Sequence, residues 1–136
     1  MTGYYTADLT GSKYVPITPI RLLDTRVGNG LPGKLAANSP RTFNITGRGL
    51  PPVPAEATAI SANATVVKET NSWAIFVGPV QSAKPATSTL NFSKGDIRAN
   101  GLTVALGFGG TLSVTYLSSA GNTTDLVIDV TGYFLP

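Results

Sequence analysis

The length and composition of the chain indicate one domain built from short strands. Its 136 residues are enough to bury a single core. Charged residues make up 12% of the chain, about half the usual share, whereas 15 glycines and 10 prolines are typical of strands joined by tight turns. This composition excludes a disordered chain and a helical bundle.

The positive charge of the chain is dispersed. Its ten Lys and Arg residues are spread between Lys13 and Arg98 without a cluster. A nucleic-acid interface usually needs a concentrated basic face, so we expect no nucleic-acid partner. No stretch approaches the roughly 18 apolar residues of a membrane span, and no signal peptide follows Met1. If Met1 is the native start, we expect synthesis in the cytoplasm without export by the usual route, and no membrane partner.

Residues 1–13 are polar and punctuated by glycine, which predicts an N-terminal arm or linker ahead of a domain at 14–136. Within the arm, Tyr4 and Tyr5 have no evident core to enter, so we expect them to dock on a neighbouring subunit. The arm also carries Thr-Gly-Tyr-Tyr at 2–5, which nearly repeats Thr-Gly-Tyr-Phe at 131–134. Such a match between head and tail is expected of a unit that joins copies of itself.

The first predicted strands follow the arm. Residues 14–19 alternate prolines with apolar residues, which predicts an extended segment at the edge of a sheet. Residues 20–27 predict a strand in which Asp24 and Arg26 share one face and Arg21 lies on the other. Asp24 and Arg26 are then close enough to pair. We favour a structural ion pair over a ligand site for these charges.

Residues 28–33 match the dinucleotide fingerprint G-x-G-x-x-G. That fingerprint needs a helix to open at its end, and Pro32 and Pro40 leave no room for one. The segment is therefore predicted to be a glycine-rich loop without a nucleotide.

Alternating apolar residues predict further strands at 41–47, 57–68, 73–77, 88–93, 101–106, 111–117 and 125–134. The glycine-rich residues 107–110 predict a hairpin between the two strands that flank them. Ala62 and Ala64 are small, so we expect a bulky side chain, with Trp73 as the candidate, to pack over them. Eight to nine short strands without a helical run predict an all-β fold, a single β-sandwich with jelly-roll character.

The last strand contains a carboxylate that needs a partner. Asp129 lies in an otherwise apolar run, where a charge must face water or meet a cation. Arg21 and Arg26 are the preferred cations. Either pairing would join the first strand of the core to the last.

The chain offers little catalytic chemistry. It has no His and no Cys, and its seven carboxylates match no catalytic motif. We therefore expect no enzyme activity, no catalytic residue, no cofactor and no metal site. Asp96 with Asn100 is a weak candidate for a calcium site, because calcium needs only oxygen ligands. Two aromatic residues in predicted strands, Trp73 and Tyr116, are candidates to contact a sugar or a subunit. Their place in strands favours the core instead.

Four segments resemble a known family: YVPITPIRLLDTR at 14–26, VPAEATA at 53–59, TLNF at 89–92 and DVTGYF at 129–134. They are similar to the tandem modules of secreted and surface proteins of Gram-positive soil bacteria, in which P-x-R-[LI]-[LV]-D-T-R opens each unit and D-V-x-G-Y-[FY] closes it. Similar modules also resemble head decorations or fibre parts of phages that infect such bacteria.

The resemblance implies a non-catalytic structural or binding module. Because this chain lacks the family's signal peptide and neighbouring modules, we favour a virion surface protein of a phage, either a capsid decoration or a fibre domain. It is expected to form a homo-oligomer, with a trimer as the guess from the general habit of decoration proteins, and to contact a capsid or neighbouring subunit. The alternative is a carbohydrate-binding or adhesion module of a secreted, cell-surface protein.

Overall fold

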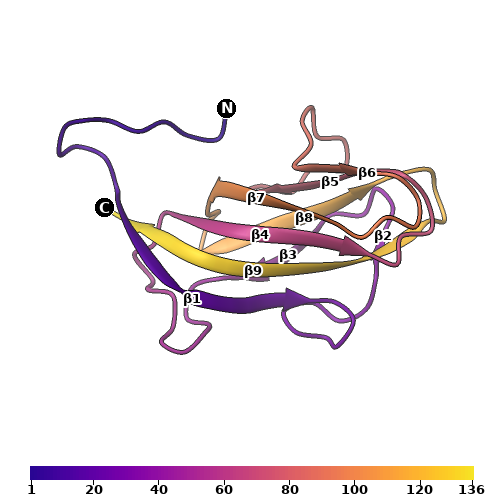
Figure 1. Cartoon of the computed structure of the whole chain (residues 1–136), viewed down its shortest axis with the longest axis horizontal. Helices are drawn as coiled ribbons and strands as arrows, with labels where there is room; N and C mark the ends of the chain where they lie inside the picture. Colours follow the sequence, from indigo (N-terminus) through magenta and orange to yellow (C-terminus); the bar gives the residue numbers. More distant parts are fainter.

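The computed structural model describes all 136 residues as two antiparallel β-sheets packed face to face, with no helix (Figure 1). The first sheet has the order β1 (Lys13–Asp24), β9 (Thr123–Leu135), β4 (Ala59–Val67) and β7 (Arg98–Ala105), and the short strand β2 (Leu35–Ala36) also pairs with β9. The second sheet has the order β3 (Arg41–Asn44), β8 (Thr111–Leu117), β5 (Trp73–Gly78) and β6 (Leu90–Phe92). The predicted all-β sandwich is confirmed.

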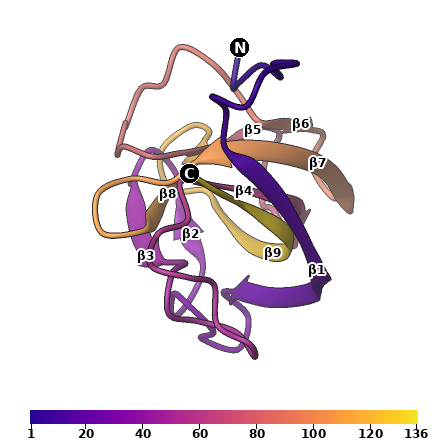
Figure 2. The same ribbon diagram turned by 90° about the vertical axis from the view of Figure 1, so that its left-hand side faces the viewer.

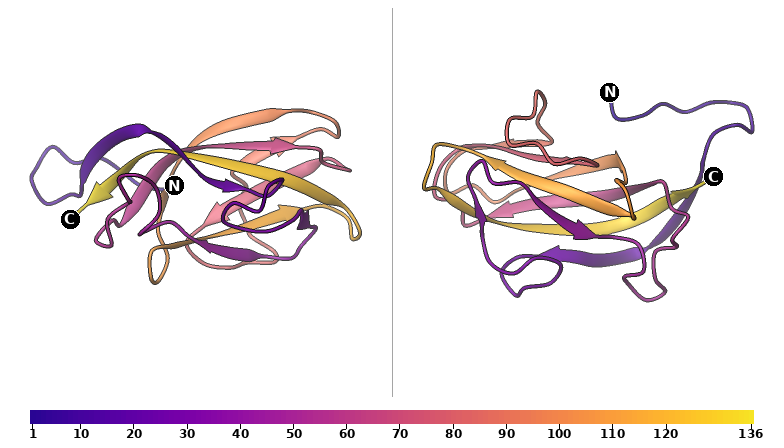
Figure 3. Two further views of the ribbon diagram at one scale, coloured as in Figure 1. Left: turned by 90° about the horizontal axis from the view of Figure 1, so that it is seen from below. Right: turned by 180° about the vertical axis from the view of Figure 1, so that it is seen from behind.

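The strand order is that of a jelly roll. Except between β5 and β6, each step of the chain from β3 to β9 crosses from one sheet to the other, so strands from both halves of the chain alternate within each sheet. The first long strand, β1, lies beside the last, β9, as both views of Figure 3 show. The two ends of the domain therefore meet in one strand pair.

The expected hairpin at residues 107–110 is wrong. β7 pairs with β4 in the first sheet, whereas β8 pairs with β3 and β5 in the second, so the glycine-rich turn carries the chain between sheets (Figure 2). Turn residues predict a reversal of the chain but not the partner of each strand. Gly107 is required there because a Cβ would collide with the carbonyl oxygen of Pro79.

The core lies between the sheets and consists of alternate residues of their strands. On β4, for example, Ile60, Ala62, Ala64 and Val66 are buried and their neighbours in sequence are half-buried. The expectation that Trp73 covers the small alanines is wrong, because Trp73 is 66% exposed. Tyr116 is the largest side chain that is fully buried, and its ring stacks on Phe92 at 6.0 Å between centroids.

Several boundaries differ from the predicted ones. β1 runs through both of its prolines as an edge strand of 12 residues and ends at Asp24 rather than at residue 27. β2 has only two residues, too few for an alternating pattern, and was not predicted. Residues 1–12 form no strand. The chain contains no helix that could cross a membrane.

Candidate functional site

The opening and closing motifs meet at the pairing of β1 with β9, where Arg21 lies opposite Asp129. Arg21 Nε donates to Asp129 Oδ1 at 2.8 Å and Arg21 Nη2 donates to Oδ2 at 3.0 Å. This two-pronged geometry is the strongest form of an Arg–carboxylate pair. The structure thus brings together Arg21 and Asp129, as expected, whereas the alternative partner, Arg26, pairs elsewhere.

Arg26 pairs with Asp24, but not as two residues of one strand face. β1 ends at Asp24, and the Asp24 carboxylate accepts the Arg26 backbone N–H at 3.1 Å and its guanidinium at 2.9 and 2.7 Å. This is a side chain closing a turn on its own backbone. A register shift between Arg21 and Leu23 also brings Arg21 Nη1 to 3.6 Å from Asp24. The hydrogen bond from the Arg26 side chain holds the pKa of Asp24 below its usual value, although burial opposes this shift.

A buried polar cluster that was not predicted from the sequence joins the end of β1 to β9. The Thr25 hydroxyl donates to Asp125 Oδ1 at 2.7 Å and accepts the backbone N–H of Leu126 at 3.1 Å. Lys34 lies 3.0 Å from the other Asp125 oxygen. Thr25 and Asp125 are 2% and 4% exposed. Predicted strand alternation alone gave no signal for this contact, since it joins residues 100 positions apart.

The glycine-rich loop after β1 is held by Arg48. Arg48 Nη1 donates to the carbonyl oxygen of Leu22 at 2.6 Å, and Nη2 donates to Asn29 Oδ1 at 2.6 Å. Burial lowers the pKa of Arg48. Gly30, with φ of +83°, leaves no room for a Cβ, which would lie 2.6 Å from the Leu22 carbonyl oxygen. Gly30 therefore serves close packing of the backbone, whereas Gly28 and Gly33 have room for a Cβ and instead adopt a positive φ.

Packing against Tyr14 explains why the closing motif contains a glycine, Gly132. The Tyr14 ring lies across Gly132, where a Cβ would collide with it, and packs 5.0 Å from the ring of Phe134. A register shift between β4 and β9 leaves Thr131 unpaired with β4. Such a bulge changes which face later residues occupy, so Tyr133 packs against the core cluster, whereas Phe134 lies outside that cluster and is buried, at 9% exposure, against Tyr14. The motif residues thus make structural contacts along the β1–β9 seam.

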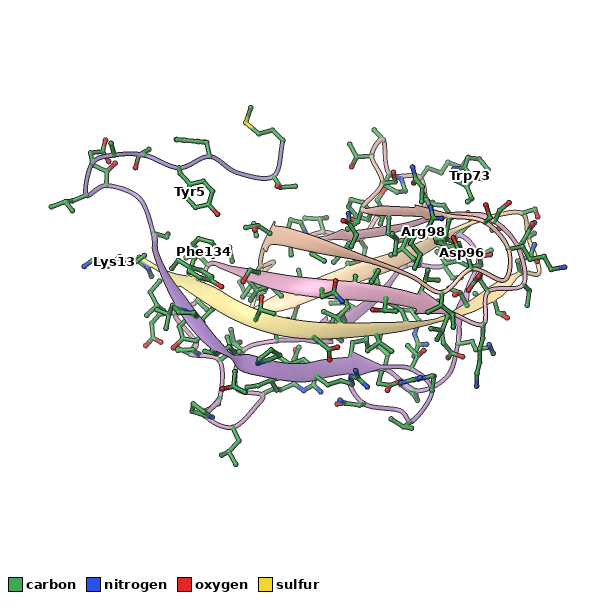
Figure 4. All side chains as sticks on the ribbon, in the orientation of Figure 1. Tyr5, Lys13, Trp73, Asp96, Arg98 and Phe134 are labelled. Carbon is green, nitrogen blue, oxygen red and sulfur yellow. The ribbon has the colours of Figure 1, made fainter.

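The N-terminal arm carries the first pair of predicted contact residues. Tyr4 and Tyr5 are 82% and 84% exposed. One hydrogen bond, between the hydroxyls of Ser12 and Thr58 at 3.3 Å, joins residues 1–12 to the sandwich. The arm arches over the end of the first sheet that holds Phe134 (Figure 4) and encloses with it a hollow of about 510 Å³. The two similar tetrapeptides therefore differ in structure, since residues 131–134 belong to β9 and residues 2–5 to the arm.

Trp73 lies at the other end of the sandwich, far from the arm (Figure 4). Strand alternation would place it with Ile75 and Val77, which are buried, but its φ of +133° departs from strand geometry. A bulky residue at such a φ costs about 1 to 3 kcal/mol and is found where the surroundings enforce it. The ring therefore borders a surface hollow instead of entering the core.

Tyr116 is fully buried, so the core position that its strand favoured is confirmed, and its candidacy to contact a sugar or a subunit is wrong. It faces the core from the middle of the second sheet, and its hydroxyl donates to the carbonyl oxygen of Asn71 at 2.7 Å. This hydrogen bond gives the Tyr116 hydroxyl, the one polar group of this buried side chain, the partner that it needs. Tyr116 thus supports the loop that carries Trp73, and does so from beneath.

The carboxylates do not gather into a metal site, since no three of them converge. Asp96 pairs with Arg98 at 2.6 Å, while the Asn100 amide donates to the carbonyl oxygen of Thr89 at 2.9 Å. The two residues considered for calcium are therefore each engaged elsewhere. The Glu69 carboxylate is buried in the loop after β4 and accepts no hydrogen bond from the protein.

Comparisons with known proteins add no assignment to this geometry: no protein-family model matches the chain, and neither does any curated protein.

Proposed function

We propose that the chain is a structural module of a phage particle surface, a capsid decoration or fibre domain that docks through its N-terminal arm. The exposed aromatic residues of the arm carry the proposal. Tyr4 and Tyr5 hold most of their surface in solvent, on a segment that a single hydrogen bond joins to its own domain. Burying one such side chain stabilises a complex by roughly 1.5 to 3 kcal/mol. Docking of the two tyrosines on a neighbouring subunit would therefore be favourable.

The edges of the first sheet support a second contact. β1 carries Pro16 and Pro19, which cannot donate to an added strand. β7, at the opposite edge, has eight residues, no proline and only β4 as a partner. An edge of this kind accepts a strand from another chain. Thr103 of β7 also borders the hollow beneath the arm, so both contacts would involve the same end of the domain.

The jelly roll is in keeping with this role, because this architecture is common in viral capsid proteins, although it also occurs in lectins. Weak contacts repeated by symmetry on a shell add to a strong attachment. A homo-oligomer, for which we suggest a trimer, would present several arms to the shell at once.

The test compares attachment of purified chains to phage particles that lack the gene. Full-length chain should bind saturably, whereas the chain without residues 1–12, and a Tyr4→Ser/Tyr5→Ser variant, should bind at least about 100-fold more weakly at unchanged melting temperature. Val27→Ser is the control, since Val27 is an exposed apolar residue in the turn after β1, at the end of the sandwich away from the arm. Equal attachment with and without the arm, or absence of the protein from wild-type particles, would contradict the proposal and favour a secreted adhesion module.

A further inference from the structure

The hollow beside Trp73 has the shape and chemistry of a small binding site. It measures about 430 Å³ and is lined by Asn71, Ser72, Trp73, Phe92, Ser118 and Ser119. None of these side chains is charged. The exposed Trp73 indole, the buried Phe92 ring, three serine side chains and one amide therefore line one open depression.

The residues around the hollow are held in place before any ligand arrives. The loop from Asn71 to Trp73 is fixed from beneath by the Tyr116 hydroxyl and by the Ser118 hydroxyl, which donates to the carbonyl oxygen of Ser72 at 3.2 Å. Across the hollow, the Asn71 amide donates to the Ser119 hydroxyl oxygen at 3.1 Å. This frame enforces the strained φ of Trp73. A site that is already ordered loses less entropy on binding.

Two hydroxyl hydrogens remain to be shared with a ligand. The Ser72 hydroxyl makes no hydrogen bond within the protein, and the Ser119 hydroxyl oxygen accepts from the Asn71 and Asn122 amides while its own O–H has no acceptor. A ligand that fits this site has an apolar face to lie on the indole ring and acceptors around its rim.

We propose that this hollow binds a pyranose ring of a neutral glycan. One face of a pyranose is a row of C–H groups with partial positive charge, which complements the negative face of the indole. Its hydroxyls meet Ser72 and Ser119. A nucleotide fits less well because no cation lines the hollow: Arg98, near Trp73 in Figure 4, is paired with Asp96.

The position of the hollow would let a docked domain bind a glycan-coated surface, a function beyond attachment to the particle. Trp73 lies at the end of the sandwich opposite Tyr5 and Phe134 (Figure 4), so a domain attached through its arm presents the hollow outward. One ring binds weakly, with a dissociation constant of the order of a millimolar. Many copies on one particle would raise the effective affinity for a glycan-coated surface roughly 10²-fold to 10⁴-fold.

The test uses the isolated full chain, so it does not depend on assembly. Trp73 is the only tryptophan, and its fluorescence therefore reports this site alone. Methyl glycosides of glucose, galactose, mannose and N-acetylglucosamine, and the corresponding oligosaccharides, are titrated in turn. At least one should change the fluorescence saturably, and the same sugar should shift the NMR signals of Ser72 and Ser119.

The NMR titration is repeated with variants. Trp73→Ala should abolish binding, and Ser72→Ala should weaken it about 2-fold to 10-fold, the effect of one hydrogen bond. Phe108→Ala should bind as the parent does. No saturable response to any of these sugars, sugar binding that survives Trp73→Ala with the fold intact, or a response to nucleotides instead would overturn the proposal.

Discussion

Replacing Thr25 by valine should destabilise the protein more than breaking the predicted ion pair between Arg21 and Asp129 does. Valine keeps the shape of threonine and removes the hydroxyl. Thr25 is buried, and its hydroxyl serves both the Asp125 carboxylate and the N–H of Leu126. Losing a hydrogen bond to a charged group costs roughly 1.5 to 3 kcal/mol, and stranding a buried N–H costs roughly 1 to 3 kcal/mol.

We expect a loss of about 3 to 4 kcal/mol, in the lower half of the summed range of about 2.5 to 6 kcal/mol, because Lys34 still neutralises Asp125. The side chains of Arg21 and Asp129 are 48% and 26% exposed, so Asp129→Asn should cost only about 0.5 to 1 kcal/mol despite the two hydrogen bonds. Against a total stability of about 5 to 15 kcal/mol, only the first change threatens folding.

Urea unfolding followed by circular dichroism measures both values, with Thr25→Ser as the matched control that keeps the hydroxyl. The reasoning is refuted if Thr25→Val falls within about 0.5 kcal/mol of the parent, the usual range of a surface change, or if Asp129→Asn costs more.

Three further predictions concern single positions. Because the pKa of Asp24 is lowered in the folded state, its contribution to stability should be complete above about pH 4 and disappear as the pH falls through the folded-state pKa. Asp24→Asn should therefore reduce the loss of stability on acidification, measured by urea unfolding at each pH. An unchanged loss would contradict this. Gly132→Ala should cost about 1 to 3 kcal/mol in urea unfolding by displacing the Tyr14 ring, and much less in a Tyr14→Ala background, so equal costs in both backgrounds would exclude the ring as the cause. Gly107→Ala, which drives a Cβ into backbone rather than into a side chain, should lower the melting temperature more than Gly132→Ala does; the reverse order would show that the turn can shift freely.

Alternation of apolar and polar residues was enough to predict the sandwich. β8 runs over Thr111–Leu117, as expected. The prolines of residues 14–19 lie in an edge strand, β1, which was also expected. The pairing of Arg21 with Asp129 could also be anticipated, because a carboxylate in an apolar run needs a cation.

Other features depend on contacts that a local pattern does not encode. Trp73 lies in an apolar run and was expected inside, but a positive φ places it outside. Tyr116 stood in a similar run and is inside, with its hydroxyl engaged by a loop 45 residues away. The hollow at Trp73 is thus lined by the loop after β4, the first residue of β5, the last residue of β6 and the loop after β8, which lie far apart in the sequence.

The most direct test of the docking account is to place a photo-crosslinking benzoylphenylalanine at position 5 of the full chain. The arm should then crosslink to a neighbouring subunit or shell protein on irradiated particles, and the same probe at position 27, at the end of the sandwich away from the arm, should give no such product. Crosslinks from position 5 that stay within one chain, to Thr58, Thr103 or Phe134 around the hollow beneath the arm, would contradict it.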